Sequence, residues 1–228
     1  MVAQPTRRLL LVGNEPVSSE LPRVAPKPVS YAFAKRTLDI IVSASLLALL
    51  FVPMALIFLL VKMTSKGPAL YKSERIGLGG RPFMFLKFRS MHVDADQRLA
   101  DLLRQNEKDG PIFKMVKDPR VTPIGKFLRK TSLDELPQLI HVLLGQMTLV
   151  GPRPPVRCEV VQYDAAALER LSVKPGITCY WQIGGRSDLS FEKWIELDRQ
   201  YLRDMSLWTD LVILVKTPLA VFTCRGAY

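Results

Sequence analysis

The sequence predicts an α+β, mainly helical fold: a monotopic membrane protein with a proline-broken re-entrant membrane helix, a small β-hairpin and amphipathic interfacial helices. Three observations predict it. A run of 22 uncharged residues contains Pro53, two strand-like segments flank a glycine cluster, and an apolar C-terminal segment keeps single charges. A chain of 228 residues is long enough for one substantial core and too short for two.

Residues 1–34 are predicted to be a flexible tail. They contain five prolines, which is typical of segments that form no packed core. We expect the tail to be followed by a re-entrant membrane helix at residues 35–66 and by the main domain at residues 67–228.

The membrane helix is predicted from residues 40–61, which carry no charge. As a straight helix they would reach about 33 Å, enough to cross a bilayer. Pro53 removes a helical hydrogen bond, so a kink is expected there. Basic pairs flank both ends, and a spanning helix would place one pair on the wrong side of the membrane. These features favour a re-entrant helix with both ends cytoplasmic; a spanning helix and a buried core helix remain alternatives.

Further along the chain, the strand-like segments at residues 69–71 and 83–86 flank a glycine cluster at 77–80. This pattern predicts a hairpin with a glycine-rich turn, and no lysine follows that would indicate a nucleotide-binding loop. Residues 94–108 are predicted to be helical, ended by a Gly-Pro pair. Residues 208–223 form a further apolar helix, either amphipathic at a membrane surface or part of the core.

The charge distribution indicates a phosphate-bearing partner. Residues 35–157 carry twenty basic and ten acidic side chains, whereas residues 158–228 carry eight and nine. Such a field attracts phosphates of lipid headgroups, nucleotides or nucleic acid. No nucleic-acid recognition motif supports the last of these. The three cysteines contain no CxxC pair, which excludes a disulfide framework and a zinc site and fits a reduced cytosolic setting.

Asp134 and Glu135 are the strongest candidates for chemistry. Cations surround them in the sequence, with Arg129 shortly before and Arg153 after. A carboxylate among cations stays ionised and is available as a nucleophile or a metal ligand. A structural alternative remains open, because Ser132 and Glu135 have the spacing of a helix capping box. Either way, both carboxylates are expected near a helix start.

The basic candidates lie in segments of different kinds. Prolines on both sides of Arg153 fix its backbone, so its guanidinium is expected to grip a phosphate through two hydrogen bonds; a purely structural turn is the alternative. Lys87 and Arg89 point the same way at strand period, as a phosphate-facing pair or as a solvated sheet face. Arg120 lies in a proline-bounded turn, and Arg186 lies in a glycine-rich loop.

Together these motifs give the chain a family resemblance. From residue 35 onward it resembles the monotopic phosphoglycosyl transferases, also called bacterial sugar transferases. The larger members carry an additional multi-helix membrane domain in front, so this chain is expected to be the minimal catalytic form. The matching features are the proline-broken helix and residues 87–91, 118–123, 129–138, 150–154 and 174–178.

The resemblance implies an enzyme, a UDP-sugar:polyprenyl-phosphate sugar-1-phosphate transferase that works in two steps. Asp134 would attack the β-phosphorus of the UDP-sugar and release UMP, leaving a phosphosugar on its carboxylate. The polyprenyl phosphate, undecaprenyl phosphate in most bacteria, would then accept the phosphosugar. This is the first membrane step of exopolysaccharide, capsule or O-antigen synthesis. Mg²⁺ is the implied cofactor, held at Asp134 and Glu135.

The resemblance also implies site residues, partners and a location. Asp134 and Glu135 are the catalytic pair, and Pro53 breaks the membrane helix. The implied partners are the UDP-sugar, undecaprenyl phosphate, membrane lipid and downstream glycosyltransferases, with a homodimer left open and no nucleic acid. The location is the bacterial inner (cytoplasmic) membrane, with residues 67–228 as a catalytic domain on the cytoplasmic face. The residues expected to bind substrate are Lys87, Arg89, Arg120, Arg129, Arg153 and Arg186.

Two rival functions remain open at this point. A membrane-anchored adaptor could use the same basic face on anionic lipid without catalysis. A transferase could also act in one direct step, with the carboxylate pair acting only on a metal ion. Release of UMP without a polyprenyl phosphate would distinguish two-step from one-step chemistry.

Overall fold

The computed structural model describes residues 26–107, 109–223 and 226. The mostly helical α+β class predicted from the sequence is confirmed. Besides the elements below, short 3-10 turns occur, of which η3 (Leu133–Glu135) and η4 (Glu169–Ser172) bear on the site. In chain order, the elements are α1 (Val29–Leu49), α2 (Phe51–Thr64), β1 (Leu70–Ile76), β2 (Pro82–Phe88), α3 (Ala95–Leu102), α4 (Pro123–Lys130), α5 (Gln138–Leu143), β3 (Thr148–Val150), α6 (Arg157–Val160), α7 (Ala165–Leu168), β4 (Gly176–Thr178), α8 (Tyr180–Gly184), α9 (Phe191–Asp204) and α10 (Leu207–Phe222).

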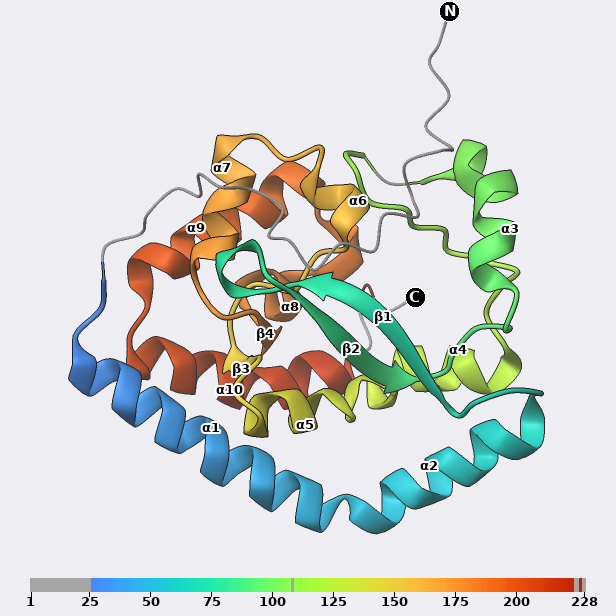
Figure 1. The fold of residues 1–228 in the computed structure, drawn as a ribbon, viewed down its shortest axis with the longest axis horizontal. Coiled ribbons are helices and arrows are strands. Elements are labelled where there is room, and N and C mark those ends of the chain that lie inside the picture. The colour runs from blue at the N-terminus through green and yellow to red at the C-terminus, as the bar shows by residue number, and fades with distance from the viewer. Residues whose placement is uncertain (1–25, 108, 224–225, 227–228) are drawn as a thin grey trace, which may run out of the picture.

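The long apolar segment forms α1 and α2, which draw an arc along one side of the molecule (Figure 1). The two helices are bent by 62° relative to each other, with the break at Leu50. Pro53 lies in the first turn of α2, where a missing N–H costs no helical hydrogen bond and the ring blocks a straight continuation of α1. The predicted proline break is therefore confirmed. Among the described residues neither helix alone has the length and apolar character to cross a bilayer, whereas the bent pair together has both.

The first helix begins earlier than the sequence indicates. Residues 29–34, which were expected to belong to the tail, are the first turns of α1. The hydroxyl of Tyr31 donates a hydrogen bond to Asp210 of α10 over 3.1 Å, so contact with the body supports these turns. The rest of the predicted tail, residues 1–25, lies outside the described residues.

A buried ion pair fixes the start of α1 to α10. The ammonium of Lys35 lies 2.8 Å from the carboxylate of Asp210, whose side chain is 1% exposed. The same ammonium donates to the carbonyl of Val150, 2.9 Å away, and the hydroxyl of Tyr201 donates to both Asp210 and Val150. Lys35 therefore joins α1, α10 and the end of β3 at one point.

Two further polar side chains hold α1 to the body. The guanidinium of Arg36 donates to the carbonyls of Val142 and Leu143 at the end of α5, over 2.6 and 2.7 Å. The carboxylate of Asp39 accepts from the Thr148 hydroxyl at 2.7 Å and the Leu149 N–H at 2.9 Å. The sequence interprets the basic pair at 35–36 as a flank of a membrane helix, and in the structure both residues are partly buried and orient α1.

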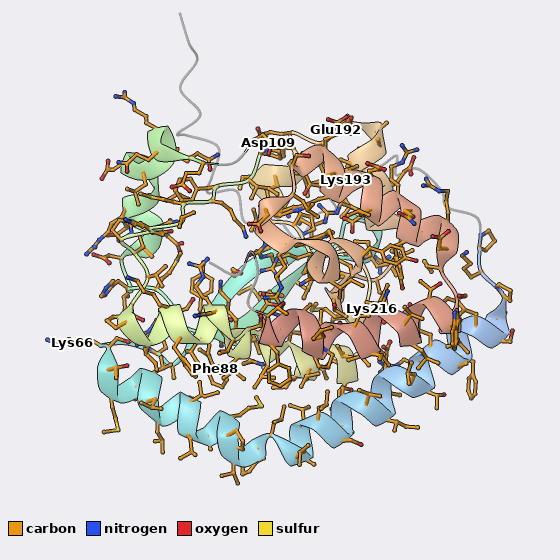
Figure 2. The ribbon with its side chains drawn as sticks, turned by 180° about the vertical axis from the view of Figure 1, so that it is seen from behind. Lys66, Phe88, Asp109, Glu192, Lys193 and Lys216 are labelled. Carbon is orange, nitrogen blue, oxygen red and sulfur yellow. The ribbon has the colours of Figure 1, made fainter. Side chains whose placement is uncertain are left out.

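The end of α2 is held by the same body. Phe88 of β2 packs with Ile57 and Val61 of α2 and with Leu128 of α4 (Figure 2). The guanidinium of Arg89 donates to the carbonyls that follow α2, those of Lys66 at 2.6 Å and Ser65 at 2.9 Å. Both ends of the α1–α2 arc therefore attach to one face of one body.

The predicted hairpin is confirmed. Strands β1 and β2 pair antiparallel, with Tyr71 opposite Lys87 and Arg75 opposite Phe83. The connection contains Gly79 at φ 69° and Gly80 at φ 73°, a left-handed backbone that favours glycine. The glycine cluster is a turn, in agreement with the prediction. Directly opposite residues share a face, so Tyr71, Arg75 and Lys87 lie on the same side of the hairpin.

The short parallel strands β3 and β4 position the Gly-Pro-Arg-Pro segment at residues 151–154. Thr148 of β3 pairs with Gly176 of β4, and the Gly176 N–H donates to the carbonyl of Pro152 at 2.8 Å. A Cβ on Gly176 would lie 2.1 Å from the nitrogen of Gly151, so only glycine fits this approach. Behind the pair, the largest core cluster includes Phe85, Val142, Met147, Tyr201 and Ile213.

The other predicted helices differ from the structure mainly at their ends. The helix expected at residues 94–108 ends at Leu102 and continues as a short 3-10 turn to Gln105. The apolar segment at residues 208–223 is α10, and the core interpretation holds for part of it, while its position at a membrane surface stays a prediction. Ile213 is fully buried in the core, whereas Val215 and Leu219 are 77% and 67% exposed.

Candidate active site

One cavity of about 780 Å³ lies between the hairpin, η3, α8 and the helices α1 and α10. The lining residues that α1 and α10 contribute are all uncharged, whereas the charged ones come from the hairpin, η3 and other segments, and this second part is called the charged end below. The charged end contains both carboxylates that the sequence singles out. The charged side chains that line the cavity are Arg75, Lys87, Lys114, Arg129, Asp134, Glu135, Arg153, Glu159, Arg170 and Arg186.

The two carboxylates are placed by η3, a tight turn between α4 and α5. The turn follows Ser132, whose φ of 57° is left-handed and reverses the chain after α4. The side chain of Ser132 accepts no capping hydrogen bond, so the capping-box interpretation is wrong. The helix in this region that has a side-chain cap is α4, where the Thr122 hydroxyl accepts from the Gly125 N–H at 3.0 Å. The Ser-Leu-Asp-Glu segment at residues 132–135 therefore does not cap a helix.

Asp134 is buried, with 6% of its surface exposed, and it faces the cavity. Burial raises the pKa of its carboxyl to about 6, and the neighbouring Glu135 carboxylate adds to the rise. The charges of Lys87, Arg129 and Arg153 act in the opposite direction. Within the described part of the chain no side chain or backbone group donates a hydrogen bond to this carboxylate. Its oxygens therefore remain available to a ligand in the cavity.

Glu135 is held by Arg153. An Oε1 oxygen of Glu135 accepts from Nη1 of Arg153 over 2.6 Å, and the two side chains are 19% and 29% exposed. Burial acts to raise the pKa of Glu135, but the charge and the hydrogen bond of Arg153 outweigh it and leave the pKa below its usual value. The same contact raises the pKa of Arg153. Arg153 thus lines the cavity with Nη1 bonded to the adjacent carboxylate, and its role in phosphate binding stays a prediction.

Two cations complete the surroundings of Asp134. Lys87 comes from β2, where its ammonium also lies 5.4 Å from the ring centre of Tyr71. Burial lowers the pKa of Lys87 to about 8, although the charge of Asp134 opposes this. Arg129 comes from the last turn of α4, and burial lowers its pKa as well, again against the charge of Asp134. These cations can neutralise phosphate oxygens beside the carboxylate.

The structure brings most of the predicted site residues together but not all of them. Arg186 lines the cavity from the turn after α8, where its Nε donates to the carbonyl of Gln182 at 3.3 Å. Arg89 and Arg120 do not line it. Strand β2 ends at Phe88, so the strand period that would align Arg89 with Lys87 no longer applies, and Arg89 instead bonds the carbonyls after α2. Arg120 forms a buried ion pair with Asp118 at 2.7 Å. Both arginines thus make structural contacts outside the cavity lining, and their role in substrate binding stays a prediction.

Two cavity-lining arginines were missed by the sequence interpretation. Arg75 donates to the carbonyl of Pro154 at 3.1 Å and lies 5.2 Å from the ring centre of Phe85. The position of Arg75 in the cavity could have been predicted from the hairpin register, because Arg75 lies on the same face of the hairpin as Lys87. Arg170 of η4 pairs with Asp198 of α9 at 2.7 Å. No local pattern could have indicated a pair that tertiary packing assembles.

A metal ion at this site would need water or substrate phosphates to complete its coordination. Among the described residues no group of three His, Cys, Asp or Glu side chains could enclose a metal ion. Mg²⁺, however, commonly binds through one or two carboxylates, the other positions being taken by water and substrate phosphates. Asp134, which accepts no hydrogen bond from the described residues, and the second oxygen of Glu135 fit that mode.

Comparison with known proteins shows what the chain is similar to. A sequence model of the family described as bacterial sugar transferase matches residues 30–224. The exopolysaccharide production protein ExoY of Rhizobium meliloti is 44% identical over 209 residues, which are 90% of this chain and 92% of ExoY. The UDP-galactose-lipid carrier transferase of Erwinia amylovora is 43% identical over 204 residues, covering 87% of this chain and 42% of that protein.

A third relative is similar to this chain to about the same degree. The undecaprenyl-phosphate galactose phosphotransferase of Salmonella typhimurium is 42% identical over 207 residues, or 87% of this chain and 42% of that protein. The chain thus spans less than half the length of the Erwinia and Salmonella proteins and nearly the whole length of ExoY.

Proposed function

The chain belongs to the bacterial sugar transferase family, and we propose that it transfers a sugar 1-phosphate from a UDP-sugar to undecaprenyl phosphate. The names of the Erwinia and Salmonella relatives support this donor and this acceptor. The name of ExoY supports a role in exopolysaccharide production, in which downstream glycosyltransferases would extend the lipid-linked sugar. The first two names give galactose and the name of ExoY gives no sugar, so the screen described below covers several UDP-sugars.

In the first step, a carboxylate oxygen of Asp134 attacks the β-phosphorus of the UDP-sugar. The bond from that phosphorus to the bridging oxygen breaks, UMP leaves with the electron pair, and the sugar phosphate is joined to Asp134. In the second step, a phosphate oxygen of undecaprenyl phosphate attacks the same phosphorus. The Asp134 carboxylate is released, and the product is an undecaprenyl-diphosphate-sugar.

One observation carries this proposal. Asp134 is the carboxylate of the cavity that is buried, accepts no hydrogen bond from the described residues and has Lys87 and Arg129 beside it. A purely structural carboxylate at this depth would be expected to have a donor. Lys87 and Arg129 would hold the phosphates and offset the charge of the attacking group, while Arg153 keeps Glu135 oriented.

Mg²⁺ is the proposed cofactor, bound by Asp134 and Glu135 together with phosphate oxygens of the substrate. When bound, the ion would neutralise charge on the transferring phosphoryl group. The described residues supply the remaining parts. Arg153 fixes one oxygen of Glu135 and leaves the other free, and Lys87 supplies a cation near the other carboxylate.

A screen of the purified full chain tests the proposed function. Several UDP-sugars would be incubated with and without undecaprenyl phosphate, and UMP would be measured. The proposal expects UMP with one sugar class, in catalytic amounts with the acceptor and in amounts equal to the protein without it. A one-step transferase would release UMP only with the acceptor, and a basic adaptor would release none.

The α1–α2 arc is proposed to lie in the cytoplasmic leaflet of the inner membrane, with its bend in the bilayer. Side chains along the outer side of the arc point away from the body (Figure 2). Many of them are large, apolar and exposed, and both ends of the arc contact the same body, as a re-entrant helix requires. The exposed apolar side chains include Ile41, Leu49, Phe51, Val52, Leu56 and Met63.

Labelling of introduced cysteines tests this topology. Val29 is an exposed residue at the start of the arc, Lys72 is an exposed residue of β1 beyond the end of the arc, and Cys158 is an exposed native cysteine of the body. We expect Val29→Cys and Lys72→Cys to react from the same side as Cys158, the cytoplasmic side, with peptide mapping to separate the sites. Reaction of the two introduced cysteines from opposite sides would show a spanning helix.

The buried ammonium of Lys87 predicts an alkaline loss of activity. Its pKa of about 8 means that the cation is lost as the pH rises through that value, which weakens phosphate binding. kcat/KM for the UDP-sugar is therefore expected to fall above about pH 8. Lys87→Arg, whose guanidinium stays protonated, should move the loss above about pH 10. Lys72→Arg, an exposed substitution on the same hairpin, should leave the profile unchanged, and an unshifted profile in Lys87→Arg would exclude Lys87 as its source.

Arg153→Lys is expected to lower kcat/KM for the UDP-sugar about tenfold or more, because a hydrogen bond to a charged group contributes about 1.5–3 kcal/mol. Lysine keeps the charge but loses the planar fork that can hold Glu135 and a phosphate at once. Arg157→Lys is a matched control, since Arg157 pairs with Glu74 at 2.9 Å with similar exposure but does not line the cavity. Equal kinetics in the two variants would leave Arg153 a structural role only.

A further inference from the structure

The cavity extends beyond its charged end into an apolar lobe between α1 and α10. The reaction proposed above involves only the charged end, so the lobe has no assigned role. Its floor is formed by Leu139, Leu149 and Ile177. Its walls are Leu38, Val42 and Leu46 of α1 and Leu211, Leu214 and Val215 of α10.

The lobe follows from the way α1 and α10 are attached. The ion pair of Lys35 and Asp210 joins the two helices near their starts, where Asp210 is buried and Lys35 is partly buried. Farther along, Val42 and Leu214 lie against the core cluster but are only half-buried. On α10, Ile213 is fully buried in the core while its neighbour Leu214 faces the cavity. The helices therefore present aliphatic side chains to a space that they do not close.

The lobe reaches the outside at an apolar rim. Leu211 and Val215 line the cavity, and they are 42% and 77% exposed. The hydroxyls of Thr178 and Thr217, which also line the cavity, bond each other at 2.8 Å and so leave little unsatisfied polarity in the wall. The outer side of α1 is itself apolar, with Ile41 59% exposed. An apolar surface thus runs from the arc into the cavity.

We infer that this lobe binds the first isoprene units of the acceptor's hydrocarbon chain and so guides the chain from the bilayer to the carboxylate pair. The inference rests on the proposed function. The two ends of the cavity match the two ends of one molecule, since Lys87 and Arg129 suit a phosphate and the lobe suits a hydrocarbon. An isoprenoid monophosphate joins its chain directly to the phosphate, whereas a phospholipid places glycerol between them. The continuity of the two ends favours the isoprenoid.

Tryptophan substitutions that fill the lobe test the assignment. Val42→Trp and Leu214→Trp place a large ring in the walls. Phe33→Trp and Leu219→Trp are matched controls on the same helices, exposed and outside the cavity lining. Two rates are compared in each protein: transfer to undecaprenyl phosphate, and exchange of labelled UMP into UDP-sugar, which needs no acceptor.

Transfer relative to exchange is expected to fall about tenfold or more in Val42→Trp and Leu214→Trp, through a raised KM for undecaprenyl phosphate, and to stay unchanged in the controls. An unchanged ratio in both lobe variants would overturn the inference. Absence of exchange in the wild-type protein would instead contradict the proposed function, so the two failures are distinguishable.

A second measurement does not depend on how the variants fold. Wild-type protein in vesicles of phosphatidylethanolamine and phosphatidylglycerol would be photolysed with a polyprenyl phosphate that carries a diazirine in its first isoprene units. Adducts are expected on the peptides that contain Val42 and Leu214 and should disappear with excess undecaprenyl phosphate. Adducts confined to the outer side of the arc, or formed at the lobe by a diazirine phospholipid that undecaprenyl phosphate does not displace, would contradict an isoprenoid site.

Discussion

Asp134→Asn is expected to lower the release of UMP by on the order of 10⁴-fold or more, the scale of losing a covalent nucleophile. An amide cannot form the phosphosugar bond. The substitution keeps the side-chain volume, and neither side chain nor backbone in the described residues donates a hydrogen bond to Asp134. The variant should therefore bind the UDP-sugar and fail in the first step, which radiolabelled donor and UMP detection would show.

The fold of Asp134→Asn is expected to be as stable as the wild type or more so. Burial raises the pKa of Asp134 to about 6, above its value in the unfolded chain, so ionisation at neutral pH opposes folding. That opposition is absent below the unfolded pKa, grows as the pH rises to about 6 and is constant above it. A neutral amide removes it, so thermal unfolding at pH 7 should shift upward or not at all. Asp101→Asn, an exposed substitution on α3, is the control for both assays. Turnover like that of the wild type in Asp134→Asn would refute the nucleophile assignment.

Lys35→Met is expected to destabilise the protein by roughly 3–5 kcal/mol, because it leaves the carboxylate of Asp210 buried without its cation. For a chain of this size each kcal/mol lowers Tm by roughly 2–4 °C. The substitution also removes one of the two hydrogen bonds to the carbonyl of Val150, next to the Gly-Pro-Arg-Pro segment, so activity should fall with stability. Thermal unfolding in detergent measures the shift.

Two comparisons separate this effect from a general loss of charge. Lys193→Met removes a surface ion pair with Glu196, in which the side chains are 46% and 59% exposed, and should change stability little. Lys35→Met combined with Asp210→Asn removes both charges and should recover much of the loss. If Lys35→Met unfolds at the temperature of Lys193→Met, the anchoring of α1 through this pair is not what holds the arc in place.

The local features of this fold were predictable from the sequence, because they depend on interactions within a residue or between close neighbours in the chain. Pro53 breaks a helix through its own ring, and Gly79 and Gly80 permit a tight turn through their own backbone. The cluster of Asp134 with Arg129 and Arg153 was also predictable, because these residues lie within a short stretch that forms one turn and its neighbours.

Features made by packing were not predictable. Arg89 does not point the same way as Lys87, because β2 ends one residue before it. Its guanidinium instead bonds the carbonyls at the end of α2. Arg170 meets Asp198 only because α9 folds back against η4. Asp39 stands next to a long apolar run and gives no sign that it will bond Thr148 of β3. In each case the deciding partner is distant in the chain.

The central claim, a covalent intermediate on Asp134, is tested most directly by mass spectrometry of the wild-type chain after brief exposure to the active UDP-sugar without acceptor. The account predicts a mass increase equal to one sugar phosphate, located on the peptide that contains Asp134, matched by an equal amount of UMP and lost on addition of undecaprenyl phosphate. An unmodified chain that nevertheless forms the lipid-linked sugar when the acceptor is added would contradict it and show direct transfer in a single step.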